Sequence, residues 1–214
     1  MKKGLHLTLM LASFALIVSC GDTKQSDKAQ QSNNNAQVET PTSKAADTEV
    51  DPAEVEVTIL KYSDYQCPAC KIYIPLEDAI KEEFGNRVII VNKNFPLSSH
   101  QYSQLAARAA EAAKKQGKFD AMHHEIFEGQ EKWSRGNAES IFVGYAKAIG
   151  LDMDQFKVDL HSLELQRLIM MDKQEGIMKN VNATPTFFIN GDKVEGNPSS
   201  YPQFRALIVP YLKK

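Results

Sequence analysis

Two cysteines separated by two residues, in Cys67-Pro68-Ala69-Cys70, are the residues of this chain best suited to chemistry. An apolar, β-branched run at 55–60 precedes them and a helix-like segment at 71–84 follows, so the pair lies between an expected strand and an expected helix. The free N–H groups and the positive end of a helix favour a thiolate, the reactive form of cysteine. A helix terminus alone provides about 0.3–1 kcal/mol, so neighbouring amides or the second thiol must supply the remainder. Pro68 suits a first helical turn, where a missing N–H costs little. This arrangement can form, break and exchange a disulfide.

Two cysteines at this spacing could instead form half of a zinc site. Such a site needs two more ligands, and the remaining candidates are histidines without the spacing of a zinc finger. Dithiol chemistry is therefore the favoured interpretation, and zinc binding stays open as an alternative.

The length and charge of the chain are those of a globular protein and give no indication of nucleic-acid binding. The chain has 214 residues, enough for one well-filled core with extensions, and 43% of them are hydrophobic. Its 25 Lys and Arg against 27 Asp and Glu give a net charge of −2, which offers no electrostatic footprint for nucleic acid.

The first 20 residues are expected to be a signal peptide. Lys2 and Lys3 precede an apolar stretch at 5–18 that is too short to span a bilayer comfortably. The stretch ends in LIVSCG at 16–21, which resembles the bacterial lipobox, and this resemblance implies lipidation of Cys20. An ordinary cleaved signal is the alternative. Both interpretations export the protein to an oxidising compartment, and the first anchors it to a bacterial membrane at its periplasmic or extracytoplasmic face.

Residues 21–51 are rich in polar side chains and nearly free of large apolar ones. Such a segment cannot bury enough surface to offset its ordering entropy, so we expect a disordered tether. Globular composition begins at residue 52, which makes 52–214 the expected folded domain. With Cys20 assigned to the anchor, Cys67 and Cys70 are the remaining cysteines, so no structural disulfide framework is expected.

The periodicity of apolar residues predicts the order β-α-β, about five helices, then β-β-α. The expected strands are 54–62 and 87–95, with a hairpin over 186–196 whose turn contains Asn190-Gly191. The expected helices are 71–84, 101–116, 119–127, 138–149, 153–160, 162–179 and 201–212. Pro75 should bend the first helix, Asp152 should cap the fifth, and the strand at 87–95 should be buried on both faces if it is parallel.

Three segments together resemble the DsbA-like thiol:disulfide oxidoreductases. They are SDYQCPAC at 63–70, Phe95-Pro96-Leu97 followed by His100, and ATPTFFING at 183–191. The resemblance extends over about 55–212. It implies an α/β thioredoxin fold, β-α-β and β-β-α, with a helical domain inserted at about 97–180.

By this resemblance, Cys67 is the exposed nucleophile that passes through a mixed disulfide, and Cys70 is the partially buried partner that resolves it. The two form the redox-active disulfide, with Pro68 and Ala69 in the active-site loop. The resemblance further implies that Pro185 is cis and that the Thr184 backbone faces the dithiol, where it can pair with a bound peptide.

The chain departs from the family pattern at two places. Some members carry an acidic residue six positions before the first cysteine, where this chain has Lys61, so a proton-transfer role there is in doubt. Asp64 could substitute, although a solvated turn or capping role is favoured for it. Ala69 also stands where a histidine would stabilise the thiolate, so Cys67 is expected to be less acidic than in a strongly oxidising relative.

Other notable side chains have structural interpretations. His123 and His124 are expected on the surface or in packing, His100 at the start of the alanine-rich helix, and Trp133 in packing of the helical domain. The methionines are expected to fill the core, at positions 170, 171 and 178.

These features predict an exported thiol:disulfide oxidoreductase that acts on the cysteines of unfolded or extended exported polypeptides and exchanges electrons with a membrane-bound or soluble redox partner. Thiol–disulfide exchange requires no metal or organic cofactor. A disulfide-forming oxidase is favoured because the single domain carries no evident dimerisation module. A reductase or isomerase of the same fold, and a peptide-binding or chaperone-like lipoprotein without redox activity, are the alternatives.

Overall fold

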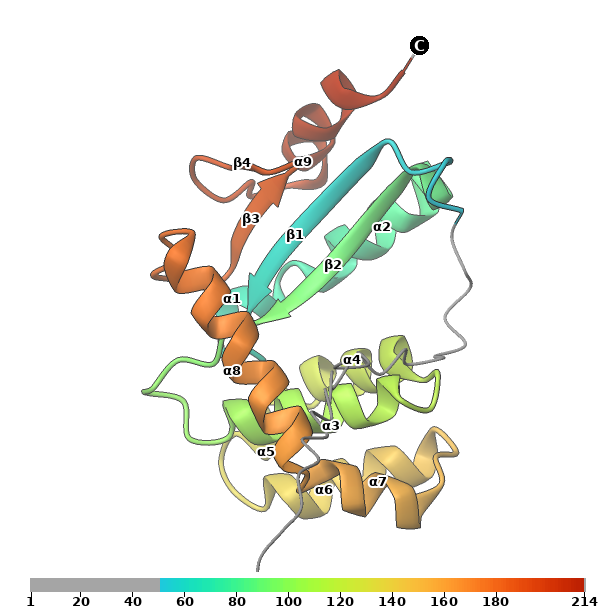
Figure 1. Ribbon diagram of the computed structural model, residues 1–214, viewed down its shortest axis with the longest axis vertical. Helices are drawn as coiled ribbons and strands as arrows, with labels where there is room; N and C mark the ends of the chain where they lie inside the picture. Colours follow the sequence, from blue (N-terminus) through green and yellow to red (C-terminus); the bar gives the residue numbers. More distant parts are fainter. Residues whose placement is uncertain (1–50, 214) are drawn as a thin grey trace, which may run out of the picture. The chain divides into compact units, whose positions relative to one another are not determined.

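Residues 51–213, the part of this computed structural model that is described, contain a four-stranded sheet in the order β2-β1-β3-β4 (Figure 1). β1 (Val57–Ser63) runs parallel to β2 (Val88–Asn94) and antiparallel to β3 (Thr186–Ile189), which pairs with the short β4 (Asp192–Lys193). The expected thioredoxin fold, β-α-β followed by β-β-α, is confirmed. Residues 1–50 and 214, which include Cys20, lie outside the described residues.

The two faces of β1 meet different helices. Val57 and Ile59 belong to a buried cluster with side chains of α2 (Ile74–Phe84) and α9 (Tyr201–Ile208). On the other face, Tyr62 packs with Phe95, Val181 and Phe188, beside α8 (Leu163–Met178). The alternation of side chains along a strand therefore places helices on both faces of the sheet.

Gly176 of α8 explains how that helix approaches the sheet closely. A Cβ atom at this position would lie 2.8 Å from the Phe95 ring and 2.9 Å from the Tyr62 ring, closer than carbon atoms can approach. Because glycine has no side chain, the helix backbone can rest directly on these two rings.

β2 is parallel to β1, as expected, but it lies at the edge of the sheet. Only its two end residues are buried and the five between are half-buried. The prediction of burial on both faces is therefore wrong for this strand, because an edge position leaves part of its surface without a neighbour.

The helix that follows the cysteines is interrupted. The structure has α1 (Pro68–Lys71) and then α2, which begins at Ile74, where one helix bent at Pro75 was predicted. Proline lacks an N–H, and its ring collides with the carbonyl four residues earlier, here that of Lys71. The break therefore falls before Pro75, and α1 is a single turn.

Six helices separate β2 from β3, one more than predicted. They are α3 (Ser103–Lys114), α4 (Phe119–Glu128), α5 (Gln130–Trp133), α6 (Ala138–Ala148), α7 (Met153–Leu160) and α8. Asp152 caps α7 as expected, since its side chain accepts hydrogen bonds from the N–H groups of Asp154 and Gln155 at 3.0 Å each. Among the described residues no helix is long and apolar enough to cross a bilayer.

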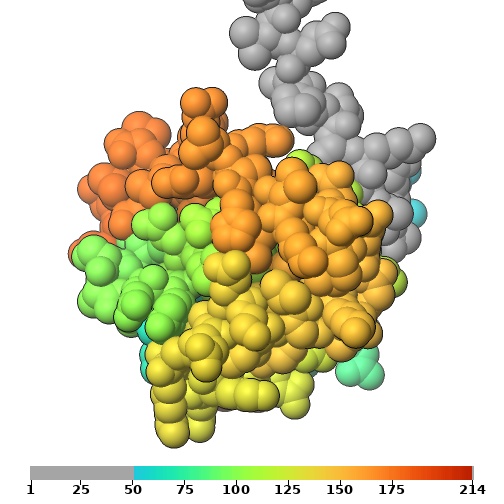
Figure 2. Space-filling model, turned by 90° about the horizontal axis from the view of Figure 1, so that it is seen from below, coloured from blue at the N-terminus to red at the C-terminus, as the bar shows by residue number. Residues whose placement is uncertain are grey.

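The inserted helices, which we call the insertion (Ser103–Met178), pack around the alanine-rich α3, and Figure 2 views the molecule from their side. Small side chains allow neighbouring helices to approach α3 closely, and six of its alanines are buried: Ala106, Ala107, Ala109, Ala110, Ala112 and Ala113. Trp133 is fully buried in this core against Phe142, as predicted, and its Nε1 donates to the Ile126 carbonyl at 2.6 Å.

The prediction that the methionines of α8 fill the core is wrong. Met170, Met171 and Met178 are 41%, 71% and 70% exposed. The buried face of α8 consists of Leu165, Ile169 and Gly176, which recur at helical spacing. The methionines occupy none of these positions and lie on the outer side of the helix.

A buried ion pair joins the sheet to α2. Lys61 of β1 is fully buried and its ammonium contacts the carboxylate of Glu77, which is also buried. The ammonium lies 5.4 Å from the centre of the Phe127 ring of α4, so the aromatic face adds to its stabilisation. Burial raises the pKa of the Glu77 carboxyl, and the Lys61 charge opposes this rise.

Removal of one partner should strongly destabilise the fold. Glu77→Leu leaves the Lys61 ammonium buried without a counter-charge, and we expect the free energy of unfolding to fall by about 3–5 kcal/mol in urea denaturation. The double variant Lys61→Met with Glu77→Leu removes both charges, so its free energy of unfolding should fall much less.

The exposed pair Lys81–Asp120 provides the control for this measurement. Asp120→Asn should change the free energy of unfolding by about 1 kcal/mol or less, because water screens exposed pairs. Equal losses in Glu77→Leu and in the double variant would show that the pair is not electrostatically coupled.

Candidate active site

Cys67 and Cys70 lie at the start of the single-turn helix α1, directly after β1 (Figure 1). Cys67 is the N-cap residue, Pro68 is the first helical residue, and both cysteines are free thiols in the structure. Cys67 retains 8% of its surface, whereas Cys70 is completely buried. Cys70 is the less accessible of the two, as expected, but the prediction that Cys67 is exposed is wrong, because both cysteines are buried.

Hydrogen bonds favour the thiolate of Cys67. Together they lower the pKa of Cys67 to about 5 against the opposing effect of burial, and the thiol of Cys70 makes the largest contribution. The Thr184 hydroxyl and the backbone N–H groups of Cys70 and Ala69 act in the same direction. The Thr184 hydroxyl is buried, and it has no hydrogen-bond partner of regular geometry among the described residues.

Cys70 has the opposite character. Burial raises its pKa far above the ordinary value, and the neighbouring Cys67 raises it further. The backbone of Asp64 and the hydroxyl of Ser63 oppose this rise without cancelling it. The pair therefore combines one sulfur that ionises easily with one that keeps its proton.

The source of this acidity agrees with the expectation that neighbouring N–H groups or the second thiol supply what a helix terminus cannot. The helix itself is shorter than expected. The positive end of a long helix was expected beside Cys67, but α1 contains only four residues. A helix dipole grows with the number of aligned peptide units, so the contribution of α1 is small. The local donors, above all the Cys70 thiol, provide the stabilisation instead.

The loop before β3 completes the surroundings of Cys67. The Thr184–Pro185 peptide bond is cis, as the resemblance implied, and the Cys67 Sγ donates to the Thr184 carbonyl at 3.4 Å. The Asn197 side chain donates to the Pro185 carbonyl at 3.1 Å, which ties this loop to the segment after the hairpin. Residues 117 positions apart in the sequence thus meet at the nucleophile.

Asp64 is buried, with 1% of its surface exposed, so the prediction of a solvated residue is wrong. Its carboxylate accepts hydrogen bonds from the N–H groups of Gln66 and Leu97, each at 2.7 Å, and contacts Nδ1 of His100 at 2.9 Å. The turn expected at Asp64 is present, but its side chain does not cap α1, whose N-cap residue Cys67 has no side-chain capping bond. His100 contacts Asp64 directly. Asp64 thereby joins the active-site segment to the chain that leaves β2.

Lys61 occupies the position where some relatives carry an acid, and its charge is matched by Glu77 from α2. The backbone of Asp64 and the side chain of Ser63, at the end of β1, lower the pKa of the Cys70 thiol. A buried carboxyl group from α2, in addition to that of Asp64, therefore lies near this end of β1.

Sequence reasoning missed three contacts that residues of the insertion, or Tyr102 directly before it, make with the active-site segment. The Gln130 side chain donates to the carbonyls of Tyr65 and Cys67, and the Gln66 side chain accepts from the N–H of Tyr102 at 2.8 Å. His123 is buried, and its Nδ1 lies 2.7 Å from the Tyr65 hydroxyl. Burial lowers the pKa of His123 well below its ordinary value, with the Lys61 charge acting in the same direction. No motif in the sequence indicates these pairings.

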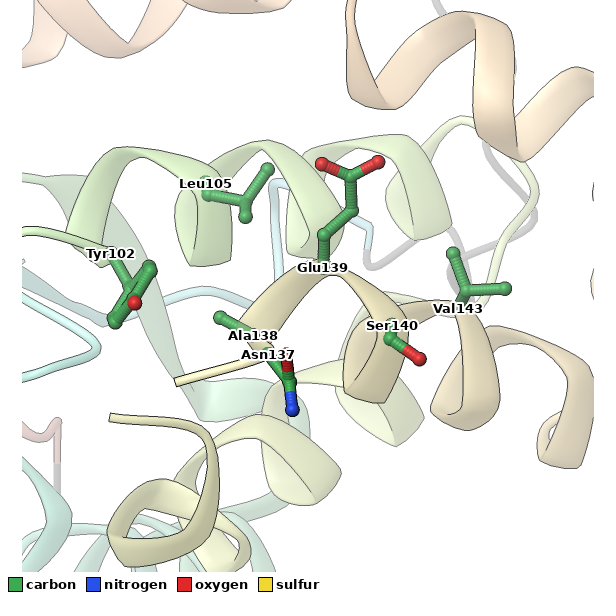
Figure 3. Close-up of a pocket in the computed structure, with 7 residues that line it drawn as sticks. All are labelled: Tyr102, Leu105, Asn137, Ala138, Glu139, Ser140 and Val143. Atoms are coloured by element: carbon green, nitrogen blue, oxygen red, sulfur yellow. The ribbon is translucent and has the colours of Figure 1, made fainter. Parts of the chain in front are cut away.

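A surface hollow of about 500 Å³ lies elsewhere, between the start of α3 and α6 (Figure 3). Its lining includes Tyr102, Leu105 and Glu139 but neither cysteine nor the cis-proline loop. Within residues 51–213 no three histidine, cysteine or carboxylate side chains come together in an arrangement that could hold a metal ion.

A family model described as thioredoxin matches residues 52–209, nearly the whole described chain. The chain belongs to the thioredoxin family. Among solved structures, this thioredoxin-family chain is similar to a thioredoxin-like oxidoreductase from Silicibacter pomeroyi DSS-3, at 27% identity and a TM-score of 0.61, over 72% of this chain and 84% of that one. It also shares the fold of alpha-DsbA1 from Wolbachia pipientis, at 21% identity and a TM-score of 0.66, over 75% and 87% of the two chains. The resemblance to DsbA-like proteins is confirmed at the level of the fold.

Curated relatives include the Na(+)/H(+) antiporter NhaA 1 of Mycobacterium sp. (strain KMS), which is 36% identical over 159 residues. The match covers 72% of this chain and 25% of the antiporter. The chain thus spans about a quarter of the length of the curated relatives it matches.

The acidity of Cys67 predicts a specific pH dependence. In the reduced protein, the rate of Cys67 alkylation by iodoacetamide should rise with a midpoint near pH 5 and level off below pH 7. Because an unfolded cysteine titrates at about 8.5, the thiolate stabilises the folded reduced form fully above that pH. This stabilisation is lost progressively as the pH falls towards 5.

Cys70→Ala provides the matched variant, since it removes the hydrogen bond that contributes most to the lowered pKa of Cys67. Its alkylation midpoint should move upward, towards about 8.5. A wild-type midpoint already near that value would contradict the proposed stabilisation of the thiolate.

Proposed function

We propose that this protein is an exported thiol:disulfide oxidoreductase that forms disulfides in other proteins. The observation that carries the proposal is the asymmetric pair at the start of α1, a thiolate-stabilised Cys67 beside a buried, protonated Cys70. The thioredoxin fold and the similarity to a thioredoxin-like oxidoreductase support the reaction class.

In the oxidising direction, a substrate thiolate attacks the Cys67 sulfur of the Cys67–Cys70 disulfide. A mixed disulfide forms, the Cys67–Cys70 bond breaks, and Cys70 leaves and takes up a proton. A second substrate thiolate then attacks the substrate sulfur of the mixed disulfide and releases the Cys67 thiolate. The substrate loses two electrons to the Cys67–Cys70 pair, which a membrane-bound or soluble redox partner reoxidises.

The stabilised thiolate also favours the oxidising direction. Whatever lowers the pKa of Cys67 stabilises the reduced protein relative to its disulfide, so the disulfide accepts electrons more readily. The first cysteine titrates at about 3.5 in the strong oxidant DsbA and at about 7 in thioredoxin. A value of about 5 lies between them and agrees with the expectation drawn from Ala69.

The cis-proline loop offers a means of binding substrate. Backbone groups of an extended polypeptide can pair with the Thr184 backbone, which lies beside Cys67. Main-chain pairing depends little on side-chain identity, so we expect unfolded or extended polypeptides as substrates rather than one folded partner.

The equilibrium with glutathione tests the direction of electron flow. We expect a reduction potential for the Cys67–Cys70 pair between about −120 mV, typical of DsbA, and about −200 mV. A potential near thioredoxin's, about −270 mV, would instead identify a reductase.

Cys67→Ser and Cys70→Ser serve as controls, and neither should form the intramolecular disulfide. A wild-type protein that exchanges no electrons with glutathione would favour the peptide-binding or chaperone-like alternative. A stoichiometric metal content in the purified protein would favour the zinc alternative.

We further propose export and lipid anchoring at Cys20, supported by the lipobox-like sequence at 16–21. In bacterial cells the wild-type protein should fractionate with membranes, whereas Cys20→Ser should be released from them, because the acyl chains would have no attachment point. Cys67→Ser should fractionate as the wild type does. Identical fractionation of Cys20→Ser and wild type would overturn the anchor.

A further inference from the structure

Gln130 is a buried side chain of the insertion that reaches the active-site segment. It is the first residue of α5, it is 4% exposed, and it lies outside the cysteine motif and the cis-proline loop. Its Nε2 donates to the Tyr65 carbonyl at 2.7 Å and to the Cys67 carbonyl at 3.1 Å. Among residues 51–213, it is the one side chain that hydrogen-bonds to the backbone of Cys67.

The elements around Gln130 hold it firmly in place. Trp133, at the other end of α5, is fully buried, and its Nε1 donates to the Ile126 carbonyl at 2.6 Å. Gly129 forms the turn between α4 and α5, where an added Cβ would lie 1.8 Å from the Tyr145 hydroxyl. The amide of Gln130 is therefore presented by a tightly packed corner of the insertion.

The Cys67 carbonyl that receives this bond also accepts the Cys70 N–H at 3.0 Å. Two donors on one carbonyl restrict the rotation of the Cys67–Pro68 peptide unit and hence the direction of the Cys67 side chain. That direction decides whether the sulfur meets the Cys70 thiol and the N–H groups of Ala69 and Cys70. A carbonyl with one donor fewer would be freer to turn.

We infer that Gln130 is a positioning residue, through which the insertion holds the Cys67 sulfur toward its hydrogen-bond donors in α1. This inference rests on the proposed function for its biological meaning, because the reaction depends on the Cys67 thiolate. It assigns the insertion a part in setting the reactivity of the dithiol.

Gln130→Met tests the inference, since methionine has similar size but cannot donate. The pH midpoint of the Cys67 thiolate in the reduced protein, followed by its absorbance at 240 nm, should rise by about half a unit to one unit. Gln130→Glu replaces the donors with a carboxyl group and should raise the midpoint at least as far, because a nearby negative charge disfavours a thiolate.

Gln116→Met is the matched control. The Gln116 side chain also bonds to backbone groups of the insertion, the carbonyl and the N–H of Asp152, but it does not contact the active-site segment. This variant should lose a comparable amount of stability on heating and leave the Cys67 midpoint unchanged. Suppose that the Gln130 variants unfold at a lower temperature but keep the wild-type pH midpoint of the Cys67 thiolate. This result would overturn the inference and leave Gln130 a purely structural residue.

If both substitutions at Gln130 prevent folding, a milder variant can still test the inference. Trp133→Phe removes the bond to Ile126 that steadies α5 and leaves Gln130 in place, so a smaller rise in the midpoint is expected. An unchanged midpoint in this variant would contradict the role assigned to α5.

Failure of this inference is distinguishable from failure of the proposed function. The thiolate titration needs no redox partner, so it reports on Gln130 even if the wild type exchanges no electrons with glutathione. Conversely, suppose that the wild type exchanges electrons with glutathione and that the Gln130 variants have the same pH midpoint of the Cys67 thiolate as the wild type. This result would overturn only the inference.

Discussion

The hydrogen bond between the Cys70 thiol and the Cys67 sulfur is the interaction on which the rest of the site depends. It is the largest of the contributions that together lower the pKa of Cys67 to about 5, and it requires that Cys70 keep its proton beside the ionised sulfur. Complete burial of Cys70 meets this requirement, because a charge is costly in an apolar environment. The interruption of the helix after Lys71 fits the same constraint, since local donors rather than a long helix dipole stabilise the thiolate.

The site also depends on buried polar groups that are satisfied by partners from other elements. The Asp64 carboxylate, almost fully buried, accepts two backbone N–H groups and contacts His100. Lys61, fully buried in β1, is matched by Glu77 of α2. Unpaired, either charge would destabilise the fold strongly. The chain therefore tolerates a lysine where some relatives have an acid because the opposite charge is supplied by the helix.

The insertion packs beside the dithiol and also makes hydrogen bonds with the segment that carries it. Two of its residues, His123 and Gln130, and Tyr102 directly before it contact the active-site segment through hydrogen bonds. These contacts act on the backbone or the side chains of residues just before Pro68, where small rotations redirect the Cys67 sulfur. Redox properties in such a fold can thus be adjusted from helices distant in sequence, without a change in the Pro-Ala pair between the cysteines.

The sequence by itself determined the fold class, most element positions, the dithiol and the cis-proline segment. Periodicity, turn residues and three family-like segments are local signals, and they suffice for these features. Tertiary structure alone decided that β2 is an edge strand, that Asp64 is buried and that the methionines of α8 face outward. It also decided which partners Lys61 and Cys67 have. These features arise from contacts between residues far apart in the chain, such as Gln130 with Cys67, and the packing of whole helices, rather than local spacing, brings such residues together.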